Sequence, residues 1–355
     1  FSFDNIKLIK AFIHFEQLSD VHTHAINKVL KQSKNDFTIH YESVLQNAMA
    51  YNKANPIYAG NQARIMLKYN AKFYTKWRFG FNLEKDAGEK INWNINHAKP
   101  GFDHFSGYLF YRGKGLFNAV IIGDFQCGFA QGLTFWRAYA FRKSSSTVAL
   151  RKVNASIRPH TGLDEYNFLR GIALSIGKSH YNIYSFLSFR NLDATPIDSS
   201  LRSFSSIIQN GYHRSAAEIY KSGLLNEILW GSNIRFNLSS WDFGASYVHQ
   251  LLSSEIIPTQ SLSSKYKFKG ASNFIIGCDA VYSFKNGHLF TELSMSANRA
   301  IAYLVGAVIT PDPSFSLYLF HRNYSVKFQP ISSNAFGENS INQNENGTYM
   351  GIEYK

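Results

Sequence analysis

Apolar and polar residues alternate with a period of two along most of the chain after Phe37. In the segment from Thr75 to Glu84, Trp77 and Phe79 occupy alternate positions with Arg78 between them. Successive side chains of a β-strand point to opposite faces, so this pattern predicts a strand with one aromatic face and one polar, charged face. The same pattern returns repeatedly further along the chain, which makes an all-β fold the primary expectation.

The length of the alternating segments and the spacing between them narrow the class of β protein. The segments run about ten residues, the length of a tilted strand that crosses a bilayer. Tight turns such as Lys285–Gly287 alternate with long polar connections at Leu192–Lys221, Ser253–Gly270 and Gln329–Gly347. This asymmetry predicts a transmembrane antiparallel β-barrel in the bacterial outer membrane, with roughly 13 to 15 strands. Because the last alternating segment reaches Lys355, the pattern leaves open whether the barrel is complete within these residues.

Composition is compatible with this class and keeps one alternative open. Aromatic residues make up 16% of the chain and charged residues only 17%, with a formal net charge of +13. No run of about 18 apolar residues is present, which excludes a transmembrane helix. A soluble β-sandwich that binds polyanions or glycans through a basic face would share the alternation and the charge. The small polar residues of the second face favour the barrel, because a soluble core would require large apolar residues there.

The barrel interpretation assigns the aromatic residues of the alternating segments to the lipid. The residues predicted to face the bilayer are Trp77, Phe79, Trp230, Phe236, Trp241 and Phe243.

The stretch from Gly123 to Gly171 interrupts the alternation with glycines, aromatics and charge mixed together. A barrel wall requires alternation, so this stretch is predicted to fold into the lumen as a polar insert. Crowded guanidinium groups repel one another unless carboxylates separate them. The predicted lumenal charge network therefore pairs Arg151, Arg158 and Arg170 with carboxylates drawn from Asp124, Asp164, Glu165 and Glu292.

Catalytic and metal chemistry is not predicted. Adjacent carboxylates such as Asp164 and Glu165 point apart on a strand and would not share a catalytic site. No nucleophile elbow, phosphate loop or dinucleotide fingerprint appears. The histidines lack paired spacing with further ligands, so neither a metal nor a cofactor is expected; those considered were His22, His24, His104, His160, His213, His249 and His321.

The residues before the first alternating segment follow a helical period. Ile6, Ile9 and Ile13 share a face in Ser2–Ile13, and Asp4 lies near the start of that segment, where a carboxylate complements the helix dipole. Residues 1–35 are therefore predicted to be helical, and residues 36–355 to form the barrel with its insert at about 123–171.

Five segments also carry a resemblance to a known family. They resemble large outer-membrane proteins of Bacteroidetes-type bacteria that are labelled helix-hairpin-helix domain proteins. The segments are Leu83–Glu89, Gly123–Trp136, Ile157–Gly171, Asn210–Arg214 and His321–Tyr324. The resemblance implies that helix-hairpin-helix repeats precede the barrel, that Ser2–Ile13 is the last helix of the final repeat, and that the barrel continues beyond Lys355.

Together these observations set expectations for function. The barrel interpretation predicts an outer-membrane protein of transport, docking or assembly type, and the missing motifs predict that it is not an enzyme. The resemblance adds a link to DNA uptake through repeats that this chain does not contain. The expected partners are the lipid bilayer, lipopolysaccharide and other outer-membrane or periplasmic proteins. DNA is expected only through those missing repeats, whose glycine hairpin would bind its phosphates.

Overall fold

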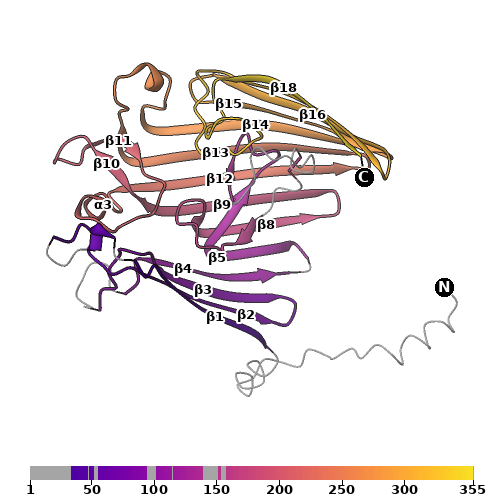
Figure 1. Ribbon diagram of the computed structural model, residues 1–355. Helices are drawn as coiled ribbons and strands as arrows, with labels where there is room; N and C mark the ends of the chain where they lie inside the picture. Colours follow the sequence, from indigo (N-terminus) through magenta and orange to yellow (C-terminus); the bar gives the residue numbers. More distant parts are fainter. Residues whose placement is uncertain are drawn as a thin grey trace, which may run out of the picture.

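The strands in the described part of the chain belong to one sheet, which curls over segments packed against one of its faces (Figure 1). The computed structural model describes residues 33–46, 48–51, 55–93, 101–113, 115–138, 151–152 and 157–354. Fourteen strands have nine or more residues: β1 (Ser33–Ser43), β2 (Ala63–Phe73), β3 (Trp77–Lys85), β4 (His104–Arg112), β5 (Phe117–Gly128), β8 (Leu169–Lys178), β9 (Tyr181–Leu192), β12 (Leu225–Leu238), β13 (Trp241–Ile256), β14 (Gly270–Phe284), β15 (Gly287–Ser296), β16 (Ile301–Asp312), β17 (Phe315–Tyr324) and β18 (Glu345–Tyr354). The shorter elements are β6 (Trp136–Arg137), β7 (Ile157–Pro159), β10 (Ala194–Pro196), β11 (Ser203–Ile207) and the helix α3 (Ala216–Tyr220).

The fourteen long strands pair in chain order, and each pairs antiparallel with the next. The short strand β11 makes a parallel contact with β13. This arrangement confirms the predicted all-β antiparallel class, and the long strands agree in number with the prediction. Within the described residues, β1 pairs only with β2 and β18 pairs only with β17 along the wall.

The two ends of the sheet differ in the length of their connections. One end carries tight turns, which include Ser239–Ser240 and Lys285–Asn286. The other end carries the long connections 193–224, 257–269 and 325–344, close to the three predicted, and Figure 1 shows them projecting on the side opposite the tight turns.

The turn predicted at Lys285–Gly287 is present. Neither Asn286 nor Gly287 adopts the positive φ that Asn-Gly hairpin turns commonly use. Instead, a Cβ on Gly287 would lie 2.2 Å from the carbonyl oxygen of Val308, so the glycine allows a close approach of neighbouring strands.

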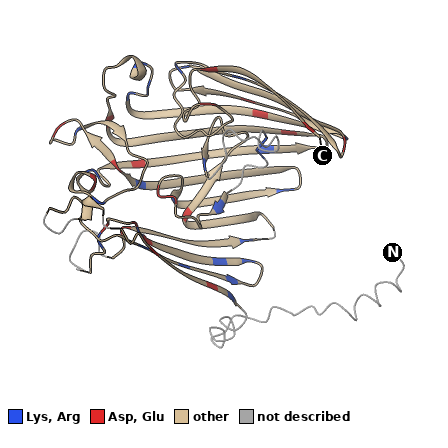
Figure 2. Cartoon of the chain, in the orientation of Figure 1, with Lys and Arg blue, Asp and Glu red and all other residues tan. Residues whose placement is uncertain are grey.

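Burial alternates along the strands and places apolar side chains outside. In β12, Ile228 and Trp230 are exposed, whereas Glu227 and Asn233 on the opposite face are buried. The buried face of the wall also holds Asn82, Ser106, Asp124, Ser188, Gln250, Asp279 and Ser294. Charged residues occupy only short parts of the strands, which are mostly tan in Figure 2. This distribution is the reverse of that in a soluble β-sandwich, whose buried faces are apolar.

The N-terminal prediction lies largely outside the described residues. The predicted helical segment Ser2–Ile13 has no described structure. The wall begins at Ser33, slightly earlier than the predicted boundary at residue 36. No helix in the described part of the chain is long and apolar enough to cross a membrane.

Candidate functional site

Two features of the interior are candidates for function: a segment that fills the space enclosed by the wall, and a polar pocket at the long-loop end. The filling segment begins and ends in the wall itself. Gly123 of β5 lies directly opposite Gly171 of β8, so the flanks of the predicted insert are parts of wall strands. Of the described residues between the two strands, the short strands β6 and β7 still pair with β5, and the others fold inward. Phe129, Leu133 and Phe135 among them are buried. The described part of this insert is hereafter called the plug (residues 129–138, 151–152 and 157–168).

The plug is attached to the far wall through a buried carboxylate. Glu292 of β15 accepts hydrogen bonds from the backbone N–H groups of Gln131, Leu133 and Thr134 at 2.8, 3.1 and 2.7 Å. Beside it, the hydroxyls of Thr134 and Ser294 lie 2.7 Å apart. The glutamate thus satisfies backbone donors that would otherwise be buried without partners, and such donors are costly to leave unpaired.

A buried ion pair forms the second attachment. Two guanidinium nitrogens of Arg137 in β6 donate to the two carboxylate oxygens of Glu227 in β12, at 2.6 and 2.7 Å. Both side chains are 0% exposed, and Gln250 of β13 donates to the same carboxylate at 2.6 Å. A bidentate pair with a third donor compensates the loss of hydration of both charges.

A second loop completes the filling of the interior. Residues 325–344, between β17 and β18, bury Phe328 and Phe336 against the wall. The backbone N–H of Trp136 donates to Ser332 O, and the N–H of Asn334 donates to Gly132 O, both at 2.8 Å. The plug and this loop therefore pack as one body.

The predicted charge network is only partly the one that forms. Arg170 donates to both carboxylate oxygens of Asp124, at 2.7 and 3.0 Å. Glu292 binds backbone N–H groups, as described above, and Asp164 accepts from the N–H groups of Tyr166 and Asn167 in its own loop. Several N–H donors already stabilise each of these two carboxylates, so neither needs an arginine partner. This explains why Glu292 and Asp164 do not form the predicted pairs.

The remaining members of the predicted network lie apart from one another. Arg158 is exposed and donates to the side-chain oxygen of Gln126 at 3.1 Å. Arg151 is half-buried within the plug. Glu165 lies at the polar pocket, where its carboxylate is 3.8 Å from His104. The pair Arg137–Glu227 was not predicted, because no local pattern connects two residues so far apart in the chain.

The residues predicted to face lipid all lie on the exposed face of the sheet. Their exposed fractions are 39–52% for Trp77, Phe79, Trp230, Phe236, Trp241 and Phe243.

The polar pocket lies where β4 begins and β9 ends, and its volume is about 440 Å³. Asp103, Glu165 and Asp193 contribute carboxylates to its lining, and Arg170 and Arg190 contribute guanidinium groups. The lining also includes His104 and His213. Burial and the nearby carboxylates of Glu89 and Asp103 raise the pKa of Glu165 to about 9. The neighbouring carboxylates and the burial therefore make ionisation of Glu165 unfavourable.

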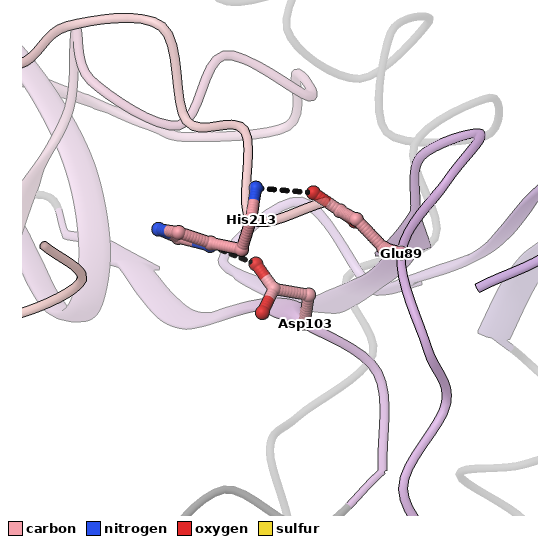
Figure 3. Close-up of side chains that lie close together, drawn as sticks. All are labelled: Glu89, Asp103 and His213. Carbon is pink, nitrogen blue, oxygen red and sulfur yellow. Dashed lines mark hydrogen bonds and ion pairs between the residues drawn. The ribbon is translucent and has the colours of Figure 1, made fainter. Parts of the chain in front are cut away.

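His213 is held by carboxylates at both ring nitrogens and at its backbone N–H, and Figure 3 shows two of them, Asp103 and Glu89. Its Nε2 lies 2.9 Å from Asp193 Oδ2, its Nδ1 makes a hydrogen bond to Asp103, and its backbone N–H donates to Glu89 Oε1 at 3.0 Å. Burial opposes a charge on the ring, but the hydrogen bonds to Asp103 and Asp193 raise the pKa of His213 to about 10. The ring is therefore protonated at neutral pH, with both nitrogens donating.

These residues come from separate connections of the chain, which is why spacing did not predict their meeting. Glu89 and Asp103 lie in the β3–β4 connection, whereas Asp193 and His213 lie in the β9–β12 connection. The spacing of residues along the sequence identifies neighbours within one strand or helix. It does not indicate which loops meet at one end of a sheet. The family resemblance had included the segments that contain Glu89 and His213, without assigning them a role.

The fold and its interior define a class: an antiparallel sheet with an apolar exposed face, a concave face that mixes polar and apolar side chains, and a filled interior. No family model and no curated protein matches the sequence. Solved structures similar to the chain include an anion-selective porin from Comamonas acidovorans, with 12% identity and a TM-score of 0.35 over 91% of this chain and 98% of the porin. OmpT, an outer-membrane protein of Vibrio cholerae, has 8% identity and a TM-score of 0.34 over 91% of this chain and 99% of its own. OmpF of Salmonella typhi, in complex with daunomycin, has 9% identity and a TM-score of 0.36 over 91% of this chain and 96% of its own. At these identities and TM-scores no function carries over to this chain.

Proposed function

We propose that this chain forms the wall of a bacterial outer-membrane β-barrel of the transport type, and that its plug closes the lumen in the resting state. The inverted burial of the wall strands carries this proposal. Large aromatic and aliphatic side chains face outward from strand after strand, while charged and amide side chains of the same strands, such as those of Glu227, Asn233 and Asp279, face inward together with apolar ones. Only a surrounding apolar solvent makes that arrangement favourable, because exposing this much apolar surface to water is costly.

The alternative, a soluble β-sandwich that binds polyanions, requires the opposite distribution. Trp230 and Phe243 would then occupy the core, and the buried Glu227 and Asp279 would face water. The two hypotheses predict different solubility, because a protein with an apolar outer face needs detergent to stay in solution. A protein that stays monodisperse in buffer without detergent contradicts the membrane proposal.

Closure of the lumen follows from how the plug is held. Three backbone hydrogen bonds to Glu292, the Arg137–Glu227 pair and the packing of residues 325–344 attach it to different parts of the wall. Passage of a solute then requires displacement of the plug, so the protein acts as a gated path.

The proposal also concerns two partners, lipopolysaccharide and DNA. The net charge of +13 favours contact with anionic lipopolysaccharide at the membrane surface. A DNA-uptake role is supported only by the family resemblance, which implies the helix-hairpin-helix repeats.

Conductance in planar bilayers tests the proposal. We expect the unmodified protein to show no steady conductance, and a variant with residues 129–166 replaced by a short Gly-Ser linker to conduct strongly. A matched control deletes residues 259–263, which form an exposed loop tip at the same end of the sheet, and should stay closed. Large, steady conductance from the unmodified protein would rule out the closed lumen.

A further inference from the structure

The carboxylates of Glu89 and Asp103 and the ring of His213 converge beside the polar pocket. One potential ligand atom from each residue lies within 4.8 Å of the other two. Glu89 is buried, and Figure 3 shows its carboxylate at the backbone N–H of His213 and the Asp103 carboxylate beside the His213 ring. We propose that Glu89, Asp103 and His213 bind one divalent transition-metal ion, with Zn²⁺ as the best match.

The way in which His213 is held is the first argument. A histidine that binds a metal through one ring nitrogen usually donates its other N–H to a carboxylate, which fixes the tautomer and the ring orientation. Asp193 occupies that position, 2.9 Å from Nε2. This contact directs Nδ1 toward Asp103. Metal binding breaks the Nδ1–H bond: the proton leaves to water, and the nitrogen lone pair forms the bond to the ion.

A second histidine supplies an independent observation. His104 is only 8% exposed and lines the same pocket, and its Nε2 has no hydrogen-bond partner among the described residues. Its Nδ1 lies 3.8 Å from the carboxylate of Glu165. A buried imidazole with an unsatisfied nitrogen is costly unless it gains a partner. The pocket that Asp103 and His213 line therefore also holds an imidazole nitrogen without a described partner and the carboxylate of Glu165.

The backbone is shaped to bring these groups together. Gly211 has a φ of +68°, and a Cβ at this position would lie 2.3 Å from Glu165 Oε2. Only glycine allows the loop to turn here and to approach Glu165 so closely, two residues before His213.

The donor set selects the kind of ion. Imidazole with carboxylates suits Zn²⁺ and similar transition metals, whereas Ca²⁺ takes six to eight oxygen ligands. The ion would join the β3–β4 connection to the β9–β12 connection. These connections already contact each other at Gly88, where an added Cβ would lie 3.1 Å from the Arg214 side chain. The three proposed ligands lie outside the plug, so the inference does not depend on closure of the lumen or on the membrane location.

Zinc titration of the untagged, detergent-purified protein after chelator treatment tests the site. Calorimetry with ZnCl₂ alone should show one ion bound per chain. Asp103→Asn and His213→Gln should abolish that binding, and Asp193→Asn should weaken it by about 10–100-fold, the usual loss when the partner of a ligating histidine is removed.

The matched control is Asp198→Asn, the same substitution at an exposed position of the β9–β12 connection. It should bind zinc like the unmodified protein. X-ray absorption at the zinc edge gives a readout that does not depend on the variants and should show nitrogen and oxygen ligands with imidazole scattering. If the unmodified protein shows no saturable zinc binding, or if correctly folded Asp103→Asn binds as the control does, the site is overturned.

Discussion

At the residue scale, the buried pair Arg137–Glu227 links the plug to the wall. An arginine with no exposed surface is tolerated only because both oxygens of one carboxylate accept from its guanidinium group. The pair also explains why Gln250 is buried on β13, where it completes the hydrogen bonds of that carboxylate. Each of these residues depends on the others, so their contributions to stability should not be additive.

Loss of the arginine should be strongly destabilising. Arg137→Met leaves a buried carboxylate without its counter-ion, and we expect the free energy of unfolding in lipid bilayers to fall by about 3 kcal/mol. This loss in free energy of unfolding is at the lower end of the usual range because Gln250 still donates to Glu227. Denaturant titration measures the change.

Two further variants complete this test. Arg158→Met removes an exposed arginine of the same plug and should cost less than about 1 kcal/mol. The double variant Arg137→Met, Glu227→Gln should recover part of the loss, since no buried charge is then left unpaired. Equal effects of the two single arginine substitutions would contradict the assigned role of the pair.

At the element scale, strand β12 shows how one strand carries apolar side chains on its outer face and polar side chains on its inner face. Ile228, Trp230 and Ile234 face outward, and between them Glu227 and Asn233 face the interior. A slip of one residue in the pairing with β9 or β13 would exchange the two sets, so the burial of the charged face fixes the register.

Arginine at an outward position in the middle of β12 tests the lipid assignment. Trp230→Arg should lower the free energy of unfolding in bilayers by about 2–4 kcal/mol, the cost of a charged side chain near the bilayer midplane. Leu238→Arg, on the same face at the turn end of the strand, should cost only about 0–1 kcal/mol. Equal stability of Trp230→Arg and the unmodified protein would show that this face does not contact lipid.

At the scale of the whole molecule, the wall, the plug and the loop end have separate physical roles. The wall satisfies its backbone hydrogen bonds between neighbouring strands, as a bilayer requires, but within the described residues β1 and β18 are not paired with each other. In the proposed function, the plug blocks the water path through the interior. The loop end gathers Glu89, Asp103, Asp193 and His213 outside the spanning strands.

The family resemblance assigns DNA binding to helix-hairpin-helix repeats and not to the residues of this chain. We expect the chain to bind duplex DNA weakly, with a dissociation constant of about 10⁻⁴–10⁻⁶ M, no sequence preference and a steep loss of affinity with added salt. Fluorescence anisotropy with two unrelated labelled duplexes at low and physiological salt measures this. Tight binding that resists salt would place DNA recognition in the residues of this chain.

The sequence by itself determined the strands, their two faces and the unequal lengths of their connections. These properties are local: side chains alternate with a period of two, and turn residues interrupt that period wherever a strand ends. The outward position of Trp230 and an inward-folding insert within residues 123–171 could both be predicted in this way, although the chain leaves β5 only after Gly128.

Only the tertiary structure decided which groups meet in the interior. Arg137 meets Glu227, and Glu292 accepts backbone N–H groups in place of the arginine that was expected. Asp103 and His213 converge from connections that are distant in sequence. Such contacts depend on how the strands stack across the sheet and how the loops fold back over its end. Hydrogen-bond donors and acceptors then pair by distance in space, which the order of residues along the chain does not record.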